Sequence, residues 1–263
     1  MNDRHEILDV LDDVPRTAKP REHGLTWMID TGAGIHQLDD VLGVCAPHVD
    51  MVKLAFGTSL VTSHLDAKLA MIRSHDVRVC LGGTLFEVMY LRGRLERYRE
   101  FLRELDVDTV EISNGAVDID QGEKVELIES FAEEFRVVSE VGSKDSSVVV
   151  APARWVRAIE AELAAGSSYV ILEGRESGTA GLYRTSGEMR TGLVEEVLDA
   201  GIDPRRLVFE APRPGHQRYL IELLGSDVNL GNIGLGDVIA CECLRRGLRG
   251  DTVEFFHGSP STG

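Results

Sequence analysis

Eight short runs of apolar residues recur along this chain, and segments with a helical pattern lie between them. Each run is short enough for a single strand, and most are apolar almost without interruption. That composition is typical of parallel strands that are covered on both faces. The runs occupy residues 25–30, 49–56, 77–83, 108–113, 136–142, 169–174, 206–211 and 227–233. The alternation predicts an α/β fold with a parallel sheet.

The segments between the runs repeat apolar residues at helical spacing. Helices are expected at 92–105, 122–135, 151–166, 191–201 and 236–248, with Gly166 and Gly201 as C-terminal caps. Eight strand–helix units over about 230 residues predict a single-domain (β/α)8 TIM barrel. An open doubly wound sheet is the alternative, but "DTGAGIH" (30–36) matches its glycine fingerprint only partly. We expect the barrel to span 21–256, with tails at 1–20 and 257–263.

The chain of 263 residues is strongly acidic, with a net charge of −16. Such a surface repels nucleic acid and anionic membranes, so neither is expected as a partner. Small anionic substrates would need a local cation or a bound metal to reverse the field.

The four cysteines show no zinc-ligand spacing, and the N-terminus has no apolar signal-peptide core. No apolar run is long enough to span a membrane. We therefore expect reduced thiols and a soluble, cytoplasmic protein.

Polar residues stand near the carboxyl ends of most predicted strands, where TIM barrels carry their active sites. Four glutamates on four consecutive strands are the strongest signal: Glu111, Glu140, Glu173 and Glu210. Ionised carboxylates that converge in a poorly solvated site need cations, and an oxygen-rich set with few histidines suits Mg²⁺. Four metal-ligating glutamates are therefore predicted, and ion pairs that merely cap the barrel are the alternative. Further polar groups are Asp30, which closes the first predicted strand, Lys53, which sits inside the second, and Asn229 and Asn232, which close the eighth.

Two glycine-rich stretches suggest phosphate binding. Turns are expected at "LGGTLFE" (81–87) and "NLGNIG" (229–234), after the third and eighth strands. The loops after strands seven and eight often hold phosphate in barrels, and Gly231 and Asn232 could offer backbone N–H groups. The alternative is that these glycines only permit tight turns.

Several motifs together resemble the phosphosulfolactate synthase family. They are "GGTLFE" (82–87), "VEIS" (110–113), "EVG" (140–142), "EGRESG" (173–178), "FEAP" (209–212), "VNLGNI" (228–233) and "LRRGLRGDT" (244–252). The resemblance runs in the family's order from about Gly24 to Thr252. It implies a (β/α)8 barrel, a homo-oligomer, and a lyase that adds sulfite to phosphoenolpyruvate with Mg²⁺, through an enediolate-type intermediate, in coenzyme M biosynthesis.

The resemblance also implies roles for individual residues. Lys144 matches the second lysine of the family's "EVGKK" and is the expected proton donor. The catalytic set is Lys144, Lys53, Glu173 and Arg175. The substrate-binding set is Asp30, Arg175, Arg213, Gln217, Asn229, Gly231 and Asn232.

The chain departs from the family pattern near the expected anion site. Thr31 and Ser143 stand where the family has lysines, and Asn114 replaces an aspartate. Arg213 and His216 are additional cationic or titratable groups in the following loop. Two alternatives therefore stay open. One is a related barrel enzyme that uses another nucleophile or enolises another phosphorylated or carboxylate substrate. The other is a non-catalytic homologue associated with heat stress.

Overall fold

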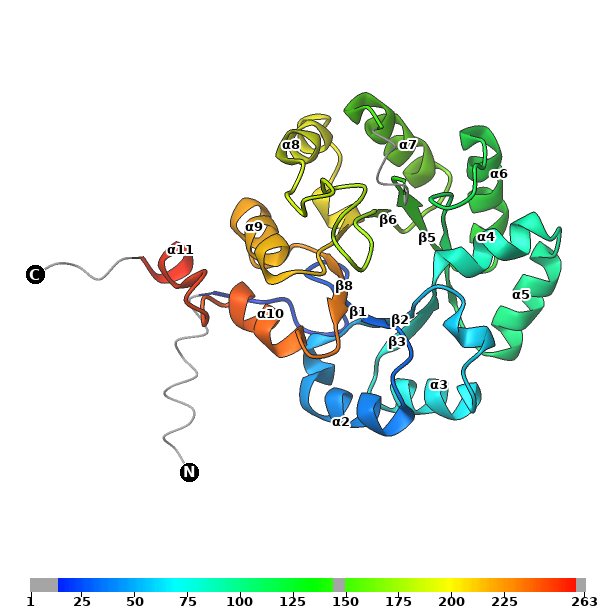
Figure 1. Ribbon diagram of the computed structural model, residues 1–263, viewed down its shortest axis with the longest axis horizontal. Helices are drawn as coiled ribbons and strands as arrows, with labels where there is room; N and C mark the ends of the chain where they lie inside the picture. Colours follow the sequence, from blue (N-terminus) through cyan, green and yellow to red (C-terminus); the bar gives the residue numbers. More distant parts are fainter. Residues whose placement is uncertain (1–13, 144–149, 259–263) are drawn as a thin grey trace, which may run out of the picture.

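Eight parallel strands close into a barrel in sequence order, and helices form a ring around it (Figure 1). The computed structural model describes residues 14–143 and 150–258. The strands are β1 Thr26–Asp30, β2 Met51–Leu54, β3 Arg78–Leu81, β4 Thr109–Ile112, β5 Arg136–Val141, β6 Tyr169–Leu172, β7 Leu207–Glu210 and β8 Leu230–Gly234. Every predicted strand is present, so the predicted (β/α)8 TIM barrel is confirmed.

The described helices include every one that the sequence predicted, with ends within a few residues. They are α2 Ile35–Cys45, α3 Leu65–Ser74, α4 Gly83–Leu91, α5 Leu95–Glu104, α6 Gln121–Ala132, α7 Pro152–Ala164, α8 Thr191–Asp199, α9 Pro214–Leu224, α10 Val238–Arg245 and α11 Val253–His257. Short 3-10 turns are η2 Ala46–His48, η3 Thr58–Leu60 and η4 Pro204–Arg206. Gly166 and Gly201 follow α7 and α8 with positive φ, as expected of residues that end a helix.

The prediction of a glycine-rich turn over 81–87 is wrong, because α4 begins at Gly83. Of the two glycines in this stretch, only Gly82 lies outside the helix. The reason for glycine at position 83 is space: a Cβ there would lie 2.5 Å from Oε1 of Glu111 and from Oγ of Ser113. Glycine thus lets the start of α4 approach the end of β4.

Two apolar layers hold the barrel together. The larger one lies between the strands and the helices and includes Phe86, Tyr98 and Trp155. The smaller one fills the barrel interior with Leu25, Trp27, Met51, Cys80, Val138, Tyr169, Ile171 and Val208. Because side chains alternate along a strand, the residues two positions after these also face the axis. This alternation determines which side chains at the carboxyl ends of the strands point into the opening of the barrel there, which we call the mouth.

Strand β8 carries a bulge against β1. Thr26 pairs with Leu230, but Met28 pairs with Ile233, so β8 has one extra residue between the two pairs. Asn232 lies in the extra stretch with φ +53°, in the left-handed region. Asparagine is one of the few residue types other than glycine that tolerate this conformation.

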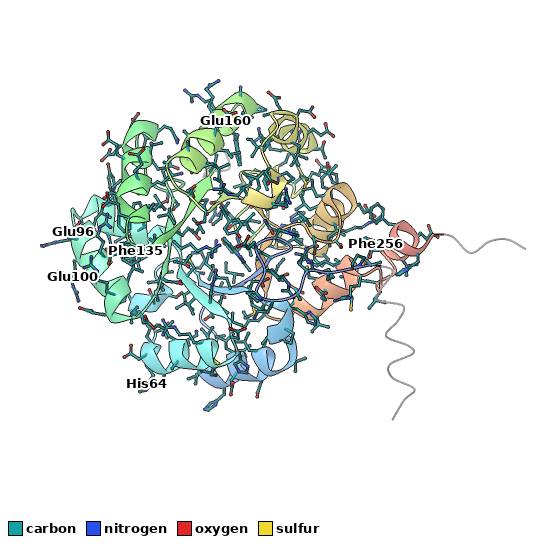
Figure 2. All side chains as sticks on the ribbon, turned by 180° about the vertical axis from the view of Figure 1, so that it is seen from behind. His64, Glu96, Glu100, Phe135, Glu160 and Phe256 are labelled. Carbon is teal, nitrogen blue, oxygen red and sulfur yellow. The ribbon has the colours of Figure 1, made fainter. Side chains whose placement is uncertain are left out.

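Acidic side chains lie on the outside of the helical ring. Glu96, Glu100 and Glu160 project outward from α5 and α7 (Figure 2). In the described part of the chain, no helix combines the length and the apolar character that crossing a membrane requires.

The first described residues pack against the body of the protein. Val14 is buried, and the Arg16 side chain is 1% exposed and pairs with Asp227 and Glu242. The expected tail at 1–20 thus includes packed residues from position 14 onward.

Candidate active site

Four glutamates enter the barrel mouth directly above the interior apolar layer. Glu140, Glu173 and Glu210 each follow an interior residue, Val138, Ile171 and Val208, by two positions on the same strand or just beyond it. Glu111 faces the axis in the same way from β4. All four side chains belong to residues no more than 2% exposed. The sequence therefore placed these carboxylates at the correct end and depth of the barrel.

The mouth encloses a cavity of about 410 Å³. The polar and charged groups that line it are Lys53, Thr84, Glu111, Glu140, Glu173, Arg175, Glu176, Glu210 and Asn232. Ile29, Ala55 and Phe56 give it one apolar side. A small site with a few convergent polar groups on such a wall is the usual form of a binding site for a small molecule.

Lys53 bridges two of the carboxylates. Its Nζ lies 2.8 Å from Oε1 of Glu210 and 3.3 Å from Oε2 of Glu111. Burial alone would lower the pKa of Lys53, but Glu111, Glu210 and Glu140 outweigh it and raise this pKa well above the usual value. Lys53 is therefore a permanent cation at neutral pH.

Three of the glutamates form a group suited to a metal ion. One carboxylate oxygen from each of Glu140, Glu173 and Glu210 lies within 4.8 Å of the others. Glu111 is not in this group; instead its Oε1 accepts a hydrogen bond from the backbone N–H of Gly83 at 2.8 Å. Three buried carboxylates supply hard oxygen ligands, which fit Mg²⁺. The predicted four-glutamate set thus separates into three candidate ligands, of which Glu210 also pairs with Lys53, and Glu111, which pairs with Lys53 but lies outside the group.

Backbone N–H groups orient two of these candidate ligands. The N–H of Gly174 donates to Oε2 of Glu210 at 2.9 Å, and that of Arg175 donates to Oε1 of Glu173 at 2.5 Å. Arg175 adopts φ +58°, so the chain turns sharply just beyond β6. The turn aims both N–H groups at carboxylates while the exposed Arg175 side chain lines the cavity.

A buried lysine that the sequence analysis did not identify supports the third candidate ligand. The Nζ of Lys124, on α6, donates to the backbone carbonyl of Glu140 at 2.6 Å and to Oδ1 of Asn114 at 3.2 Å. It also pairs with Glu162 of α7 at 2.7 Å, and both side chains are fully buried. Its three N–H donors thus have three acceptors. The sequence contains a sign that Lys124 is buried, because this lysine lies on the apolar stripe of α6 with Ile128 and Phe131.

Asn232 presents an amide to the cavity. Asn232 is 4% exposed, and its Oδ1 has no hydrogen-bond partner among the described residues. Burying an amide oxygen without a partner is costly. The bulge that aims this group into the mouth is therefore consistent with a bound ligand that offers a donor.

Two residues predicted at the mouth lie elsewhere. Asp30 points away from the axis, because Ile29 faces the cavity and side chains alternate; its carboxylate pairs with Lys68 and accepts from the N–H groups of Gly32 and Ala33. Asn229 does not close β8 but precedes it, at the amino end of the barrel.

The amide of Asn229 ties three backbone segments together there. Its Nδ2 donates to the carbonyls of Arg205 and Leu207, and its Oδ1 accepts from the N–H of Leu25. Gly231 lies inside β8 rather than in a turn, and its carbonyl accepts from Ala211 at 2.9 Å.

The remaining predicted residues flank the mouth or fall outside the described chain. The buried Gln217 donates to the carbonyl of Ala211 at 3.1 Å, and the exposed Arg213 donates to the carbonyl of Ser177 at 2.6 Å. Neither lines the cavity. Lys144 lies outside the described residues.

Comparison with known proteins identifies the family of this chain. A family model described as (2R)-phospho-3-sulfolactate synthase matches residues 14–251. A phosphosulfolactate synthase from Bacillus subtilis is 38% identical over 239 residues, covering 90% of this chain and 95% of the relative. One from Methanothermobacter thermautotrophicus is 40% identical over 245 residues, covering 91% and 95%.

The chain belongs to the phosphosulfolactate synthase family.

Solved structures add evidence for the fold of this family member. The YdjI aldolase from Escherichia coli superposes with a TM-score of 0.54 at 13% identity, covering 99% of this chain and 98% of the aldolase. An orotidine 5'-phosphate decarboxylase from Pyrococcus horikoshii gives 0.55 at 10% identity, covering 84% and 99%. These likenesses show a shared barrel and nothing about this family member's chemistry.

Proposed function

We propose that this chain is a phosphosulfolactate synthase that adds sulfite to phosphoenolpyruvate with the help of Mg²⁺. The observation that carries the proposal is the joint placement of Glu140, Glu173 and Glu210 beside a permanently charged Lys53. Relatives named phosphosulfolactate synthase, alike over nine-tenths of the chain, support the choice of reaction.

The three carboxylates would hold the metal ion. Their oxygens are close enough to share one cation, and hydrogen bonds from Gly174 and Arg175 already orient two of the three. A bound Mg²⁺ would supply a Lewis acid for the negative charge that builds on the substrate carboxylate during addition.

The cationic residues of the mouth would bind the phosphate and carboxylate of the substrate. Arg175 lines the cavity opening with a planar guanidinium, which suits oxyanions. Lys53 adds a fixed positive charge between Glu111 and Glu210. The Oδ1 of Asn232 would accept a hydrogen bond from a bound water molecule, and its Nδ2 would donate to an oxygen of the substrate.

Sulfite needs little activation, because it is already a good nucleophile at neutral pH. Its attack forms a carbon–sulfur bond at the methylene carbon, and the neighbouring carbon must then gain a proton. We propose that Lys144 donates this proton. That role rests only on the match of Lys144 to the family motif. We further propose that the protein acts as a homo-oligomer in the cytoplasm.

A direct test is phosphorus NMR of the purified protein with phosphoenolpyruvate, sulfite and Mg²⁺. We expect the substrate phosphorus signal to be replaced by that of a phosphate monoester on an sp³ carbon only when sulfite is present. EDTA should abolish the change, and Mg²⁺ should restore it. Loss of substrate without sulfite would indicate another reaction on the same barrel. No change under any condition would favour the non-catalytic alternative.

A further inference from the structure

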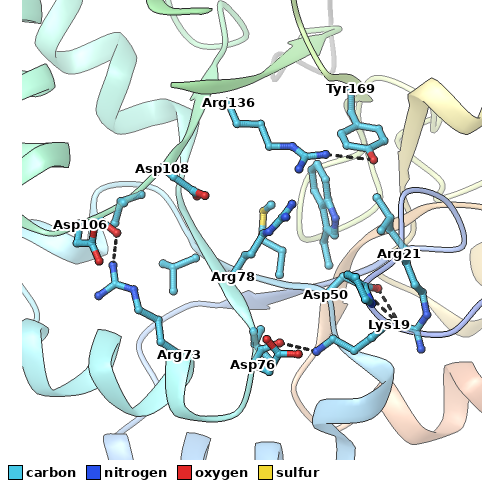
Figure 3. Close-up of a pocket in the computed structure, with 17 residues that line it drawn as sticks. Lys19, Arg21, Asp50, Arg73, Asp76, Arg78, Asp106, Asp108, Arg136 and Tyr169 are labelled. Carbon is cyan, nitrogen blue, oxygen red and sulfur yellow. Dashed lines mark hydrogen bonds and ion pairs between the residues drawn. The ribbon is translucent and has the colours of Figure 1, made fainter. Parts of the chain in front are cut away.

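A second cavity, of about 390 Å³, opens at the amino end of the barrel, opposite the mouth (Figure 3). We call it the amino-end pocket. Its charged lining consists of the five cations Lys19, Arg21, Arg73, Arg78 and Arg136 and the four acids Asp50, Asp76, Asp106 and Asp108. The five cations and four acids give this lining a net charge of +1, whereas the whole chain has a net charge of −16. Cations are thus concentrated here against the overall balance.

Two of these cations rise from strand positions that face the barrel axis. Arg78 precedes the interior residue Cys80 by two positions on β3, and Arg136 precedes Val138 in the same way on β5. We call them the axial arginines. Arg78 is exposed and Arg136 half-buried. Figure 3 shows both side chains reaching into the space between the strand starts.

The other three cations are already engaged at the rim. Arg21 makes two hydrogen bonds of 3.1 Å to the carboxylate of Asp50. Lys19 and Arg73 donate to backbone carbonyls, including those of residues 76 and 106. By contrast, neither axial arginine has a carboxylate within ion-pair distance among the described residues, although three further aspartates line the same pocket.

Buried aromatic rings fix the wall beside the axial arginines. Trp27 and Tyr169 meet edge to face at 5.9 Å, and both are at most 5% exposed. The guanidinium of Arg136 lies 5.3 Å from the centre of the Tyr169 ring and 3.4 Å from its hydroxyl. That hydroxyl donates to the carbonyl of Glu22 at 2.7 Å. Arg136 is therefore held in place before any ligand arrives.

We propose that the amino-end pocket binds a phosphate group, free or as a small monoester, between the axial arginines. Guanidinium groups match the geometry of phosphate oxygens, and an arginine held by an aromatic ring loses little freedom on binding. The volume lies near the lower end for small-molecule sites, which suits an ion or a small ester. This site is separate from the mouth and does not depend on the reaction proposed there.

The two tryptophans of the chain allow a local test. Trp27 lines the amino-end pocket, whereas Trp155 is a buried residue of α7 and serves as an internal reference. Inorganic phosphate and glycerol 3-phosphate would each be titrated into ¹⁵N-labelled protein, with the two indole signals assigned through Trp155→Phe. We expect the Trp27 signal to shift saturably and the Trp155 signal to stay constant. Tighter saturation by glycerol 3-phosphate would identify a monoester as ligand, and equal saturation would identify free phosphate.

Charge-removing variants decide whether the arginines are responsible. Arg78→Gln and Arg136→Gln should each weaken the saturation at Trp27 at least about tenfold. Arg97→Gln, which removes an exposed charge from α5, should leave it unchanged. If one variant fails to fold, as judged by circular dichroism, the other still tests the site. A shift at Trp27 that sodium chloride reproduces at equal ionic strength, or that survives both variants, would overturn the proposal.

Discussion

The ammonium of Lys53 lies 2.8 Å from the carboxylate of Glu210, and both groups are buried in the barrel mouth. This pair leaves Glu210 with a dual role, because the same residue also belongs to the group of three candidate metal ligands. The fixed charge of Lys53 and a bound divalent cation would together offset most of the negative charge of the four glutamates.

Removing Lys53 should destabilise the protein strongly. In Lys53→Met, Glu111 and Glu210 lose their shared cation, and breaking a buried ion pair typically costs about 3–5 kcal/mol. Chemical denaturation would measure the free energy of unfolding. Arg218→Met, at an exposed ion pair on α9, should change it by no more than about 1 kcal/mol. Equal effects of the two variants would contradict the description of Lys53.

The contribution of Lys53 should not vary with pH near neutrality. Its pKa is raised in the folded state, so the stability it contributes is fully present below the unfolded value of about 10.5 and is lost only as pH rises through the higher folded value. The Lys53 ammonium should therefore stay protonated from about pH 6 to about pH 9. Nitrogen NMR of protein labelled with ¹⁵N-lysine would check it across that range, with the Lys53 signal assigned by its absence in Lys53→Met. A Lys53 signal that titrates with a midpoint below about pH 9 would contradict the raised pKa.

Substitutions of the glutamates should separate the candidate metal ligands from Glu111. Glu140→Gln, Glu173→Gln and Glu210→Gln should each weaken Mn²⁺ binding, measured by electron paramagnetic resonance, by about tenfold or more. Glu111→Gln should retain most of the affinity, because Glu111 bonds to Gly83 and Lys53 instead. Equal loss in all four variants would restore the four-ligand set that the sequence predicted.

Lys124 should act by positioning Glu140 rather than by touching the substrate. Lys124→Met leaves Glu162 buried without its cation and should cost about 3–5 kcal/mol of stability. Adding Glu162→Leu should recover part of that stability, but the bond to the Glu140 carbonyl stays lost. The double variant should therefore remain weak in Mn²⁺ binding although it is folded. Full metal affinity in a stable double variant would contradict the positioning role.

Asn232 offers a test of the cavity wall. Asn232→Gly keeps the left-handed backbone of the bulge but removes the amide. We expect the Michaelis constant for phosphoenolpyruvate to rise about tenfold, as the loss of one buried hydrogen bond predicts, with thermal stability little changed. Asn232→Ala should lose stability as well, since alanine is strained at positive φ. An unchanged Michaelis constant in the glycine variant would remove Asn232 from the binding site.

The barrel could be predicted because its signal is periodic. Each strand is a short apolar run, and the alternation of eight runs with helices leaves few arrangements. The position of Glu140, Glu173 and Glu210 followed from the same periodicity, since the carboxyl end of each strand was visible in the sequence.

The errors arose where one residue decides the orientation. Asp30 ends β1 as predicted, but side chains alternate along the strand, so Asp30 points toward Lys68. The preceding residue, Ile29, lines the cavity in the barrel mouth instead. Asn229 was assigned to the end of β8, because the bulge there and the exact start of the strand leave no pattern in the sequence. The ion pair of Lys124 joins the consecutive helices α6 and α7, but periodicity alone does not say which side chains meet between two neighbouring helices.

Carbon NMR with phosphoenolpyruvate labelled with ¹³C at the methylene carbon tests the proposed reaction most directly. With sulfite and Mg²⁺, we predict that the vinylic signal of this carbon is replaced by that of a saturated carbon bonded to sulfur, and that Glu173→Gln abolishes the change. A vinylic signal that persists with folded, metal-loaded protein and excess sulfite would contradict the assignment of this chain as a sulfite-adding synthase.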